Sequence, residues 1–250
     1  MIKFQHVSKS FDGKKVLDEV SGRFEQGRVN LVIGASGTGK SVLIKCIVGL
    51  IHADQGSISF DGSEFISGPS KRTVRVRREI GMLFQGGALF DSKNVEENVI
   101  FPLDILTDMP QDAKLDRVNF CLQRVGLSNA NKKMPSELSG GMQKRVGVAR
   151  AIVNNSKYLF CDEPTSGLDA RTGLLIDELI QELTYEYNIT TTIVTHDMNT
   201  VVSMGDNILF LEKGKNTWEG TSADIFHVDV AALKDFLFAS KLMRMAKTQV

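Results

Sequence analysis

The sequence predicts an α/β fold with a mainly parallel sheet that carries helices on both faces. Short apolar, β-branched segments alternate along the chain with longer segments of helical spacing, which is the pattern of such sheets. A glycine-rich turn joins a buried strand, residues 29–33, to a helix that follows it. A second apolar strand, residues 158–161, runs directly into two acidic residues. In open sheets of this kind, ligands bind at the carboxyl ends of the strands, where both features lie.

The composition restricts the class of protein. With 250 residues, 42% of them hydrophobic, the chain can bury one large core or two small ones. Its 30 basic and 30 acidic residues balance, which argues against a nucleic-acid binder. Three widely spaced cysteines without a CxxC pair suggest neither a disulfide framework nor a zinc site, and they fit a reducing cytosol. No segment reads as a signal peptide or a bilayer-spanning helix, so we expect spanning helices to belong to other subunits.

The other elements follow in chain order. We expect antiparallel strands over 2–7, 16–24 and 57–61, parallel strands over 80–84 and 190–194, and helices over 40–50, 113–125, 141–154 and 170–187. Prolines at 102, 110 and 135 bracket a helical region. We therefore predict one domain over 1–250, in which an α/β core, about 1–92 and 156–228, holds an inserted helical subdomain, about 93–155, and ends in a helical tail, 229–250.

The glycine-rich turn has the residues of a phosphate-binding loop. Residues 34–41 fit the pattern G-x-x-x-x-G-K-[ST] between a predicted strand and a predicted helix. Glycines let the backbone turn so that its N–H groups point at a β-phosphate, Lys40 can reach the β- and γ-phosphates, and the Ser41 hydroxyl can bind Mg²⁺. A plain glycine-rich turn would rarely match all eight positions. The predicted ATP-binding residues are Gly34, Ala35, Ser36, Gly37, Thr38, Gly39, Lys40, Ser41 and Val42.

Three further side chains follow two of the predicted strands. Asp162 and Glu163 end the strand at 158–161, where Asp162 can hold Mg²⁺ through water and Glu163 can polarise an attacking water as general base. Taken alone, two acids at a strand end are more often solvated surface residues. His196 follows the strand at 190–194 and can contact a γ-phosphate, although a lone histidine is more often a structural hydrogen-bonding residue. Beside a phosphate-binding loop, we assign all three to catalysis or metal binding.

A second glycine turn opens a second helix and carries a family resemblance. Residues 138–145 read Leu-Ser-Gly-Gly-Met-Gln-Lys-Arg, with Ser139 as a suitable N-cap. This segment resembles the signature of ABC ATPases, and it stands between the phosphate-binding loop and the acidic strand, as in that family. The resemblance implies a P-loop NTPase fold: an ABC cassette with a RecA-like sheet, an antiparallel β subdomain and a helical subdomain. It also implies ATP hydrolysis that drives transport across a membrane.

The resemblance assigns roles to further residues. In ABC ATPases two cassettes pack head to tail, so Ser139, Gly140 and Gly141 would bind the γ-phosphate held by the partner copy. Gln85 matches the glutamine that reaches Mg²⁺, and Asp169, in Ser-Gly-Leu-Asp at 166–169, matches the loop at the dimer seam. Phe11 stands where an aromatic residue stacks on adenine. The family more often has Tyr there, and a core-facing Phe is the alternative.

The segment after Gln85 resembles one group within the family. Gln-Gly-Gly-Ala-Leu-Phe-Asp-Ser at 85–92 and Phe-Pro-Leu at 101–103 are similar to the ATPases of Mla-type systems, which move phospholipid between the membranes of Gram-negative bacteria. Lys93 and Asn94 depart from the usual Leu-Thr. The resemblance implies a peripheral position on the cytoplasmic face of the inner membrane, an integral permease, an MCE-type lipid-binding protein and a small regulatory subunit. The motor of a small-solute or lipoprotein transporter is the main alternative.

Three further features of the sequence each have two interpretations. Ala88, Leu89 and Phe90 line a groove for the permease or form a buried turn. A basic cluster between Lys71 and Arg78 is a solvated helix face or a contact for anionic headgroups. The helical spacing of 230–245 indicates a cap on its own domain or a surface for another subunit.

Two other functional classes fit the sequence less well. A soluble ABC ATPase acting on ribosomes usually has two cassettes in one chain, and one acting on DNA has a long coiled coil between its nucleotide motifs. One phosphate-binding loop, one signature and a short helical region occur here. A scaffold that binds ATP without hydrolysis would not need Glu163 and His196.

Overall fold

The computed structural model describes residues 1–65 and 71–238 and divides the chain into two compact units. Unit 1 comprises 1–25, 29–66 and 194–250, and unit 2 comprises 26–28 and 67–193. Both units combine strands and helices, as the predicted α/β fold requires. The predicted division into core, helical subdomain and tail has different bounds and stays a prediction.

Unit 1 contains the predicted antiparallel strands. A four-stranded sheet has the order β2-β1-β4-β5, built from β1 (Ile2–Phe11), β2 (Lys14–Phe24), β4 (Gln55–Phe60) and β5 (Ser63–Glu64). In the register of β1 with its neighbours, Ile2 lies opposite both Phe24 and Phe60. The rings of Phe4 and Phe24 pack at 5.0 Å between centroids, and both side chains are buried. Burial alternates over the first four residues of β1, which gives this part of the sheet one apolar face.

Unit 1 also contains the strand that leads into the phosphate-binding loop. This strand, β3 (Val29–Ile33), is completely buried and pairs in parallel with β9 (Asn207–Glu212), which pairs in turn with antiparallel β10 (Lys215–Gly220). The helices are α1 (Lys40–Ile47), α7 (Met198–Met204) and α8 (Ala231–Leu237), with the short η2 (Ile225–His227). The elements β9, β10 and α7 were not predicted from the sequence.

Helix α1 is shorter than predicted. It ends at Ile47 rather than at residue 50, because Gly49 takes a left-handed conformation with φ +74°. The amides of Leu50 and Ile51 then turn back to the carbonyl of Lys45, which closes the last turn of the helix. Within the predicted tail, the structure has α8 from Ala231 to Leu237, and residues 239–250 lie outside the described residues.

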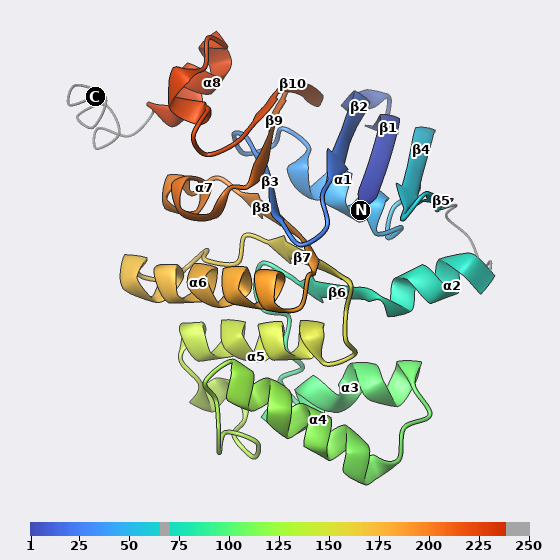
Figure 1. The fold of residues 1–250 in the computed structure, drawn as a ribbon, viewed down its shortest axis with the longest axis vertical. Helices are drawn as coiled ribbons and strands as arrows, with labels where there is room; N and C mark the ends of the chain where they lie inside the picture. Colours follow the sequence, from blue (N-terminus) through green and yellow to red (C-terminus); the bar gives the residue numbers. More distant parts are fainter. Residues whose placement is uncertain (66–70, 239–250) are drawn as a thin grey trace. The chain divides into compact units, whose positions relative to one another are not determined.

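The helix that begins in the signature segment, α5 (Gly140–Ile152), lies at the centre of unit 2. The strands of this unit are ordered β8-β7-β6, with β6 (Ile80–Leu83) and β7 (Tyr158–Asp162) parallel, and β8 (Thr190–Thr195) has its first four residues in this unit. The helices are α2 (Lys71–Arg78), α3 (Val95–Leu106), α4 (Gln111–Arg124), α5 (Gly140–Ile152) and α6 (Ala170–Glu186), with the short η1 (Pro135–Glu137). Helix α5 lies between α6 on one side and α3 and α4 on the other, and it also contacts β6 (Figure 1).

Within the described ranges, no helix has both the length and the apolar character needed to cross a membrane.

Candidate functional site

The phosphate-binding loop of unit 1 has the backbone that its glycines predict. Gly34 follows β3 with φ +146°, and a Cβ at this position would lie 2.3 Å from the carbonyl oxygen of Leu211. No other residue fits there, because a backbone atom of β9 occupies the space. The Thr38 hydroxyl donates to the Ala35 carbonyl at 2.9 Å and closes the turn. The loop therefore enters α1 with its amides at a helix N-terminus, where an anion is stabilised.

Lys40 crosses this loop. It is 6% exposed, and its ammonium donates to the carbonyl oxygens of Gly34 at 2.8 Å and Ala35 at 2.9 Å. The first two residues of the loop therefore hold the ammonium in place, although Lys40 belongs to the first turn of α1. A phosphate at the loop would meet a charge that is already in position.

Two further predicted residues lie in unit 1. His196 directly follows β8 and is exposed, and the next residue, Asp197, caps α7 by accepting from the amide of Asn199 at 2.9 Å. Phe11 ends β1 and is 41% exposed, with the Lys9 ammonium 5.3 Å from its ring centroid. The core-facing interpretation of Phe11 is therefore wrong. Its stacking on adenine stays a prediction.

Unit 2 presents the acidic pair at the carboxyl end of β7. Asp162 is the last residue of the strand, and Glu163 follows with φ +50°, in the left-handed region that non-glycine residues rarely occupy. Both are partly buried, behind the fully buried strand residues 158–161. The carbonyl of Glu163 accepts from the Ser166 amide at 3.2 Å, which starts the turn toward α6. This left-handed backbone sets the direction of the Glu163 side chain, and its role as general base stays a prediction.

Asp169 has a local structural role in this unit. It is the N-cap of α6, where its carboxylate accepts from the amide of Thr172 at 3.0 Å and from its hydroxyl at 2.6 Å. These two bonds hold the pKa of the Asp169 carboxyl below its ordinary value. The side chain predicted at a dimer seam thus fixes the start of α6.

The signature turn contacts the same helix start. Ser139 caps α5 by accepting from the Met142 amide at 3.3 Å, and both Ser139 and Gly140 are exposed. Gly141 is buried, and a Cβ on it would lie 2.5 Å from the Thr172 Cγ2 atom. The glycine pair therefore serves two purposes: Gly140 leaves the N-terminus of α5 open, and Gly141 lets α5 approach α6 closely.

The first residues after β6 are fixed to α5. Gln85 is exposed, and its carbonyl accepts from the ammonium of Lys144. The guanidinium of Arg150 donates to the carbonyls of Gly87 at 2.7 Å and Ala88 at 2.8 Å. Burial lowers the pKa of both cations. Neither residue was predicted from the sequence, because a lysine or an arginine in a helix usually faces solvent.

An apolar groove of about 250 Å³ lies beside this segment. Phe90, which is 40% exposed, packs edge-on against Phe101 at 4.7 Å between ring centroids. Ala88 is exposed as well, so the buried-turn interpretation is wrong for both residues. Leu89 is partly buried and does not line the groove. The apolar lining consists of Phe84, Ala88, Phe90, Phe101, Pro102 and Leu106, among other residues.

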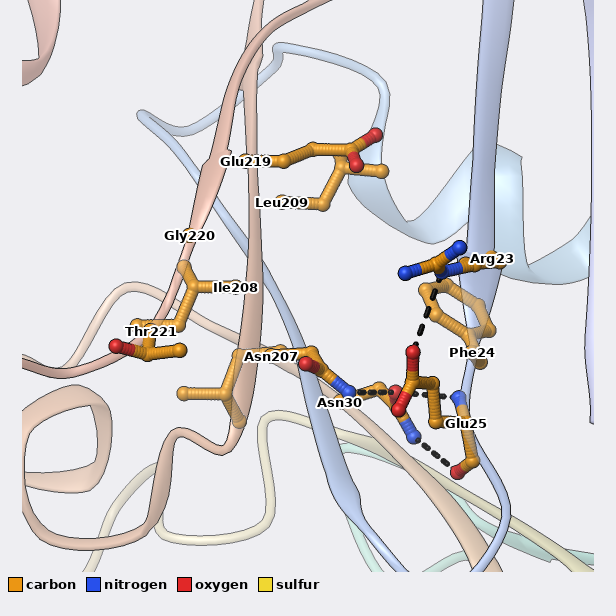
Figure 2. A pocket seen from close by; sticks show the side chains of 11 residues that line it. Arg23, Phe24, Glu25, Asn30, Asn207, Ile208, Leu209, Glu219, Gly220 and Thr221 are labelled. Atoms are coloured by element: carbon orange, nitrogen blue, oxygen red, sulfur yellow. Dashed lines mark hydrogen bonds and ion pairs between the residues drawn. The ribbon is translucent and has the colours of Figure 1, made fainter. Parts of the chain in front are cut away.

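A second pocket, of about 230 Å³, lies in unit 1 at the amino ends of β3 and β9 (Figure 2). Polar side chains bond to one another across it. The Arg23 guanidinium lies 3.2 Å from the Glu25 carboxylate, and the Asn30 amide bonds both to the backbone of Glu25 and to Asn207. Because these contacts join β2 to β3 and β9, we assign this network to the stability of unit 1. The phosphate-binding loop leaves the opposite, carboxyl end of β3.

The predicted metal ligands suit Mg²⁺ only together with other oxygen donors. Ser41, Gln85 and Asp162 supply a hydroxyl, an amide and one carboxylate. Among residues 1–65 and 71–238, no three histidine, cysteine or acidic side chains come together as a metal site. Mg²⁺ typically takes one or two carboxylates and fills its other positions with water and nucleotide phosphates. The donor set therefore fits an ion that arrives with a nucleotide.

Comparison with known proteins supports the resemblance to ABC ATPases. A family model described as "ABC transporter" matches residues 17–166. The chain is 36% identical over 236 residues to the probable ribonucleotide transport ATP-binding protein mkl of Mycobacterium leprae, covering 94% of this chain and 68% of that protein. It is 39% identical over 229 residues to the methionine import ATP-binding protein MetN of Carboxydothermus hydrogenoformans, covering 90% and 68%.

Solved structures agree in fold. The ATP-binding cassette MJ0796, in a dimeric state bound to ADP and Pi, matches with a TM-score of 0.80 at 30% identity, covering 89% of this chain and 99% of that one. The cbiO1 protein from Clostridium perfringens, part of the transporter complex cbiONQ, matches with a TM-score of 0.84 at 28% identity, covering 98% of each chain.

Proposed function

Because this chain belongs to the ABC transporter family and is an ATPase of a membrane transporter, we propose that it drives phospholipid transport between inner and outer membranes. The observation that carries this proposal is the segment Gln-Gly-Gly-Ala-Leu-Phe-Asp-Ser at 85–92, which is similar to Mla-type ATPases. Its Ala88 and Phe90 are exposed beside an apolar groove rather than buried. An exposed apolar groove indicates a docking surface for another protein.

The chemical step is assigned to the residues of the predicted motifs. The loop amides and Lys40 bind the β- and γ-phosphates, and Glu163 acts as general base toward the attacking water. His196 contacts the γ-phosphate. Bound through Ser41, Gln85 and Asp162, Mg²⁺ would neutralise charge on the phosphates.

The signature turn supports a head-to-tail dimer of two copies. Ser139 and Gly140 are exposed at the N-terminus of α5, where a phosphate is stabilised by the free amides and the helix dipole. A phosphate-binding turn without a second nucleotide on its own chain is half of a site. In the proposed cycle, ATP closes the dimer by joining the two halves, and hydrolysis with phosphate release opens it.

The proposed partners follow from the same assignment. An integral permease docks at the groove beside Ala88 and Phe90, which places the chain on the cytoplasmic face of the inner membrane as a peripheral subunit. An MCE-type lipid-binding protein and a small regulatory subunit complete the complex. The basic helix α2 is assigned to solvent, since the chain as a whole is neutral.

Purification in detergent with the permease tests the proposal. Phe90→Asp places a charge in the apolar groove, so we expect loss of the co-purifying permease and of its bound phospholipid. Phe120→Asp is the matched control, because Phe120 is also 40% exposed but lies on α4 outside the groove. Retention of the permease by Phe90→Asp would refute the docking surface. A permease that carries no lipid would refute the substrate.

Import of a small solute is the second candidate, because the relatives named above are a probable ribonucleotide transport protein and a methionine import protein. Proteoliposomes of the purified complex separate the two functions. ATP-dependent movement of labelled phospholipid supports the first, and ATP-dependent accumulation of labelled methionine or ribonucleotide without lipid movement supports the second.

A further inference from the structure

Lys144 is a buried cation for which the mechanism above has no use. It lies in the second turn of α5 and is 5% exposed. Its ammonium donates to two backbone carbonyls, those of Gln85 and of Glu163, the latter at 3.4 Å. None of the ion pairs found among the described residues includes it.

Such a position is unfavourable for a lysine unless the charge has a task. Removal of an ammonium from water costs several kcal/mol, and a side chain of similar volume without charge would fill the same space at lower cost. Hydrogen bonds from a cation to carbonyl oxygens are stronger than neutral ones and recover part of this cost. The two carbonyls that receive them belong to a proposed magnesium ligand and to the proposed base.

The backbone at Glu163 needs such support. A non-glycine residue at φ +50° costs about 1–2 kcal/mol relative to the right-handed region and persists only where its surroundings hold it. The carbonyl of Glu163 is held from two directions, by the Ser166 amide at 3.2 Å and by the Lys144 ammonium. Because the direction of the Glu163 carboxylate depends on this backbone conformation, both donors influence where the carboxylate points.

The segment that contains Gln85 is seated on the same helix. A Cβ at Gly147 would lie 2.6 Å from the Leu83 Cδ1 atom, so α5 and the end of β6 touch directly. Gly147 lies about one turn beyond Lys144 and makes this close contact. Arg150 lies about two turns beyond Lys144, and its guanidinium donates to the carbonyls of Gly87 and Ala88. The groove residue Ala88 and the base Glu163 are thereby fixed to one helix through short contacts.

We propose that Lys144 is a positioning residue for ATP hydrolysis, whose ammonium ties the peptide of Gln85 to that of Glu163. The base is then held in its productive orientation only while the segment after β6 is seated on α5. This inference rests on the proposed role of Glu163 as general base. It adds a second residue whose loss slows the chemical step without weakening the binding of nucleotide.

The test measures kcat, KM for ATP and nucleotide affinity in the full chain assembled with its permease. Lys144→Met keeps the length of the side chain and removes the charge. We expect kcat to fall at least tenfold while KM and affinity change less than threefold, with a melting temperature equal to or above that of the wild type. Lys157→Met is the control, because it removes an exposed lysine of the same unit that pairs with Glu79. We expect the control to keep its kcat.

Coupling to Glu163 separates positioning from a general structural effect. In a Glu163→Gln background, single-turnover rates should fall less than twofold further on adding Lys144→Met, since the lysine acts through the residue already altered. Lys144→Gln repeats the measurement if the methionine variant does not fold. The proposal would be overturned if a folded variant that lacks the cation kept its kcat within twofold of wild type. It would also be overturned if nucleotide affinity fell as much as kcat.

The parallel Glu163→Gln variant identifies which idea fails. Normal turnover of the Glu163→Gln variant would refute the role of Glu163 as general base, and the inference about Lys144 would be refuted as well. If Glu163→Gln loses turnover and Lys144→Met keeps it, only the positioning role of Lys144 is refuted, and Glu163 remains the proposed base.

Discussion

The contact between the signature helix and α6 predicts an unusual response at Gly141. Gly141→Ala adds a methyl group that would lie 2.5 Å from the Thr172 Cγ2 atom, well inside contact distance. Rotation of Thr172 would relieve the clash but break the 2.6 Å bond from its hydroxyl to the Asp169 carboxylate. Alanine is normally the better helix residue, so the sign of the effect separates close packing from helix propensity.

The magnitude follows from three opposing contributions. Overpacking costs about 1–3 kcal/mol, and a lost hydrogen bond costs about 1 kcal/mol if Thr172 rotates. Replacement of glycine by alanine within a helix returns up to about 1 kcal/mol. We expect a net loss of about 1–2 kcal/mol in the free energy of unfolding. With an m value of about 3 kcal/mol/M, the urea midpoint should fall by about 0.3–0.7 M.

Urea unfolding followed by circular dichroism measures this shift. Gly140→Ala is the matched control, since its Cβ would meet the nearest atom, Leu168 Cδ2, at an ordinary 3.4 Å. Thr172→Ser removes the obstructing methyl group but keeps the hydroxyl that bonds Asp169. In that background, Gly141→Ala should leave the midpoint unchanged or raise it. Equal stability of the two alanine variants, or no recovery in the serine background, would refute the close-packing argument.

Three further predictions concern the site. Lys40→Ala should weaken nucleotide binding about 10–100-fold, because a charge-assisted bond contributes about 1.5–3 kcal/mol; titration with a fluorescent ATP analogue measures this, and unaltered affinity would contradict the phosphate-binding assignment. Glu163→Gln should keep nucleotide affinity, lose at least about 100-fold in turnover and accumulate an ATP-bound dimer in size-exclusion chromatography; near-normal hydrolysis would remove Glu163 as base. The Asp169 carboxylate has a lowered pKa, so its contribution to stability is full above the unfolded value of about 3.9 and is lost as pH falls through the lower folded value; Asp169→Asn should flatten that acid limb of the stability profile, and an unchanged limb would contradict its capping role.

The phosphate-binding loop and the acidic strand end could be predicted from sequence because their conformations are local. Residues 34–39 form the predicted turn between β3 and α1, which begins at Lys40, and β7 ends at Asp162 as the pattern of apolar residues indicated. Most helix predictions hold within a few residues for the same reason: periodicity, caps and glycines act over one or two turns. The family signature added specificity because several such motifs occur in one order.

Long-range pairing was decided only by the tertiary structure. The strand β3 pairs with β9, which lies more than 170 residues later in the chain, and neither β9 nor β10 was predicted from the sequence. Phe11 and Phe90 each had a buried alternative in the sequence, and the tertiary packing leaves both side chains exposed.

By itself, the sequence of this protein determined which chemical groups are present and the local turns that carry them. The tertiary structure decided that Lys144, an ordinary polar residue of a helix pattern, is buried against the carbonyls of Gln85 and Glu163. Burial and electrostatic environment depend on which distant segments cover a side chain, and those contacts form only when the chain folds into layers. Local periodicity cannot specify them, because it describes one element at a time.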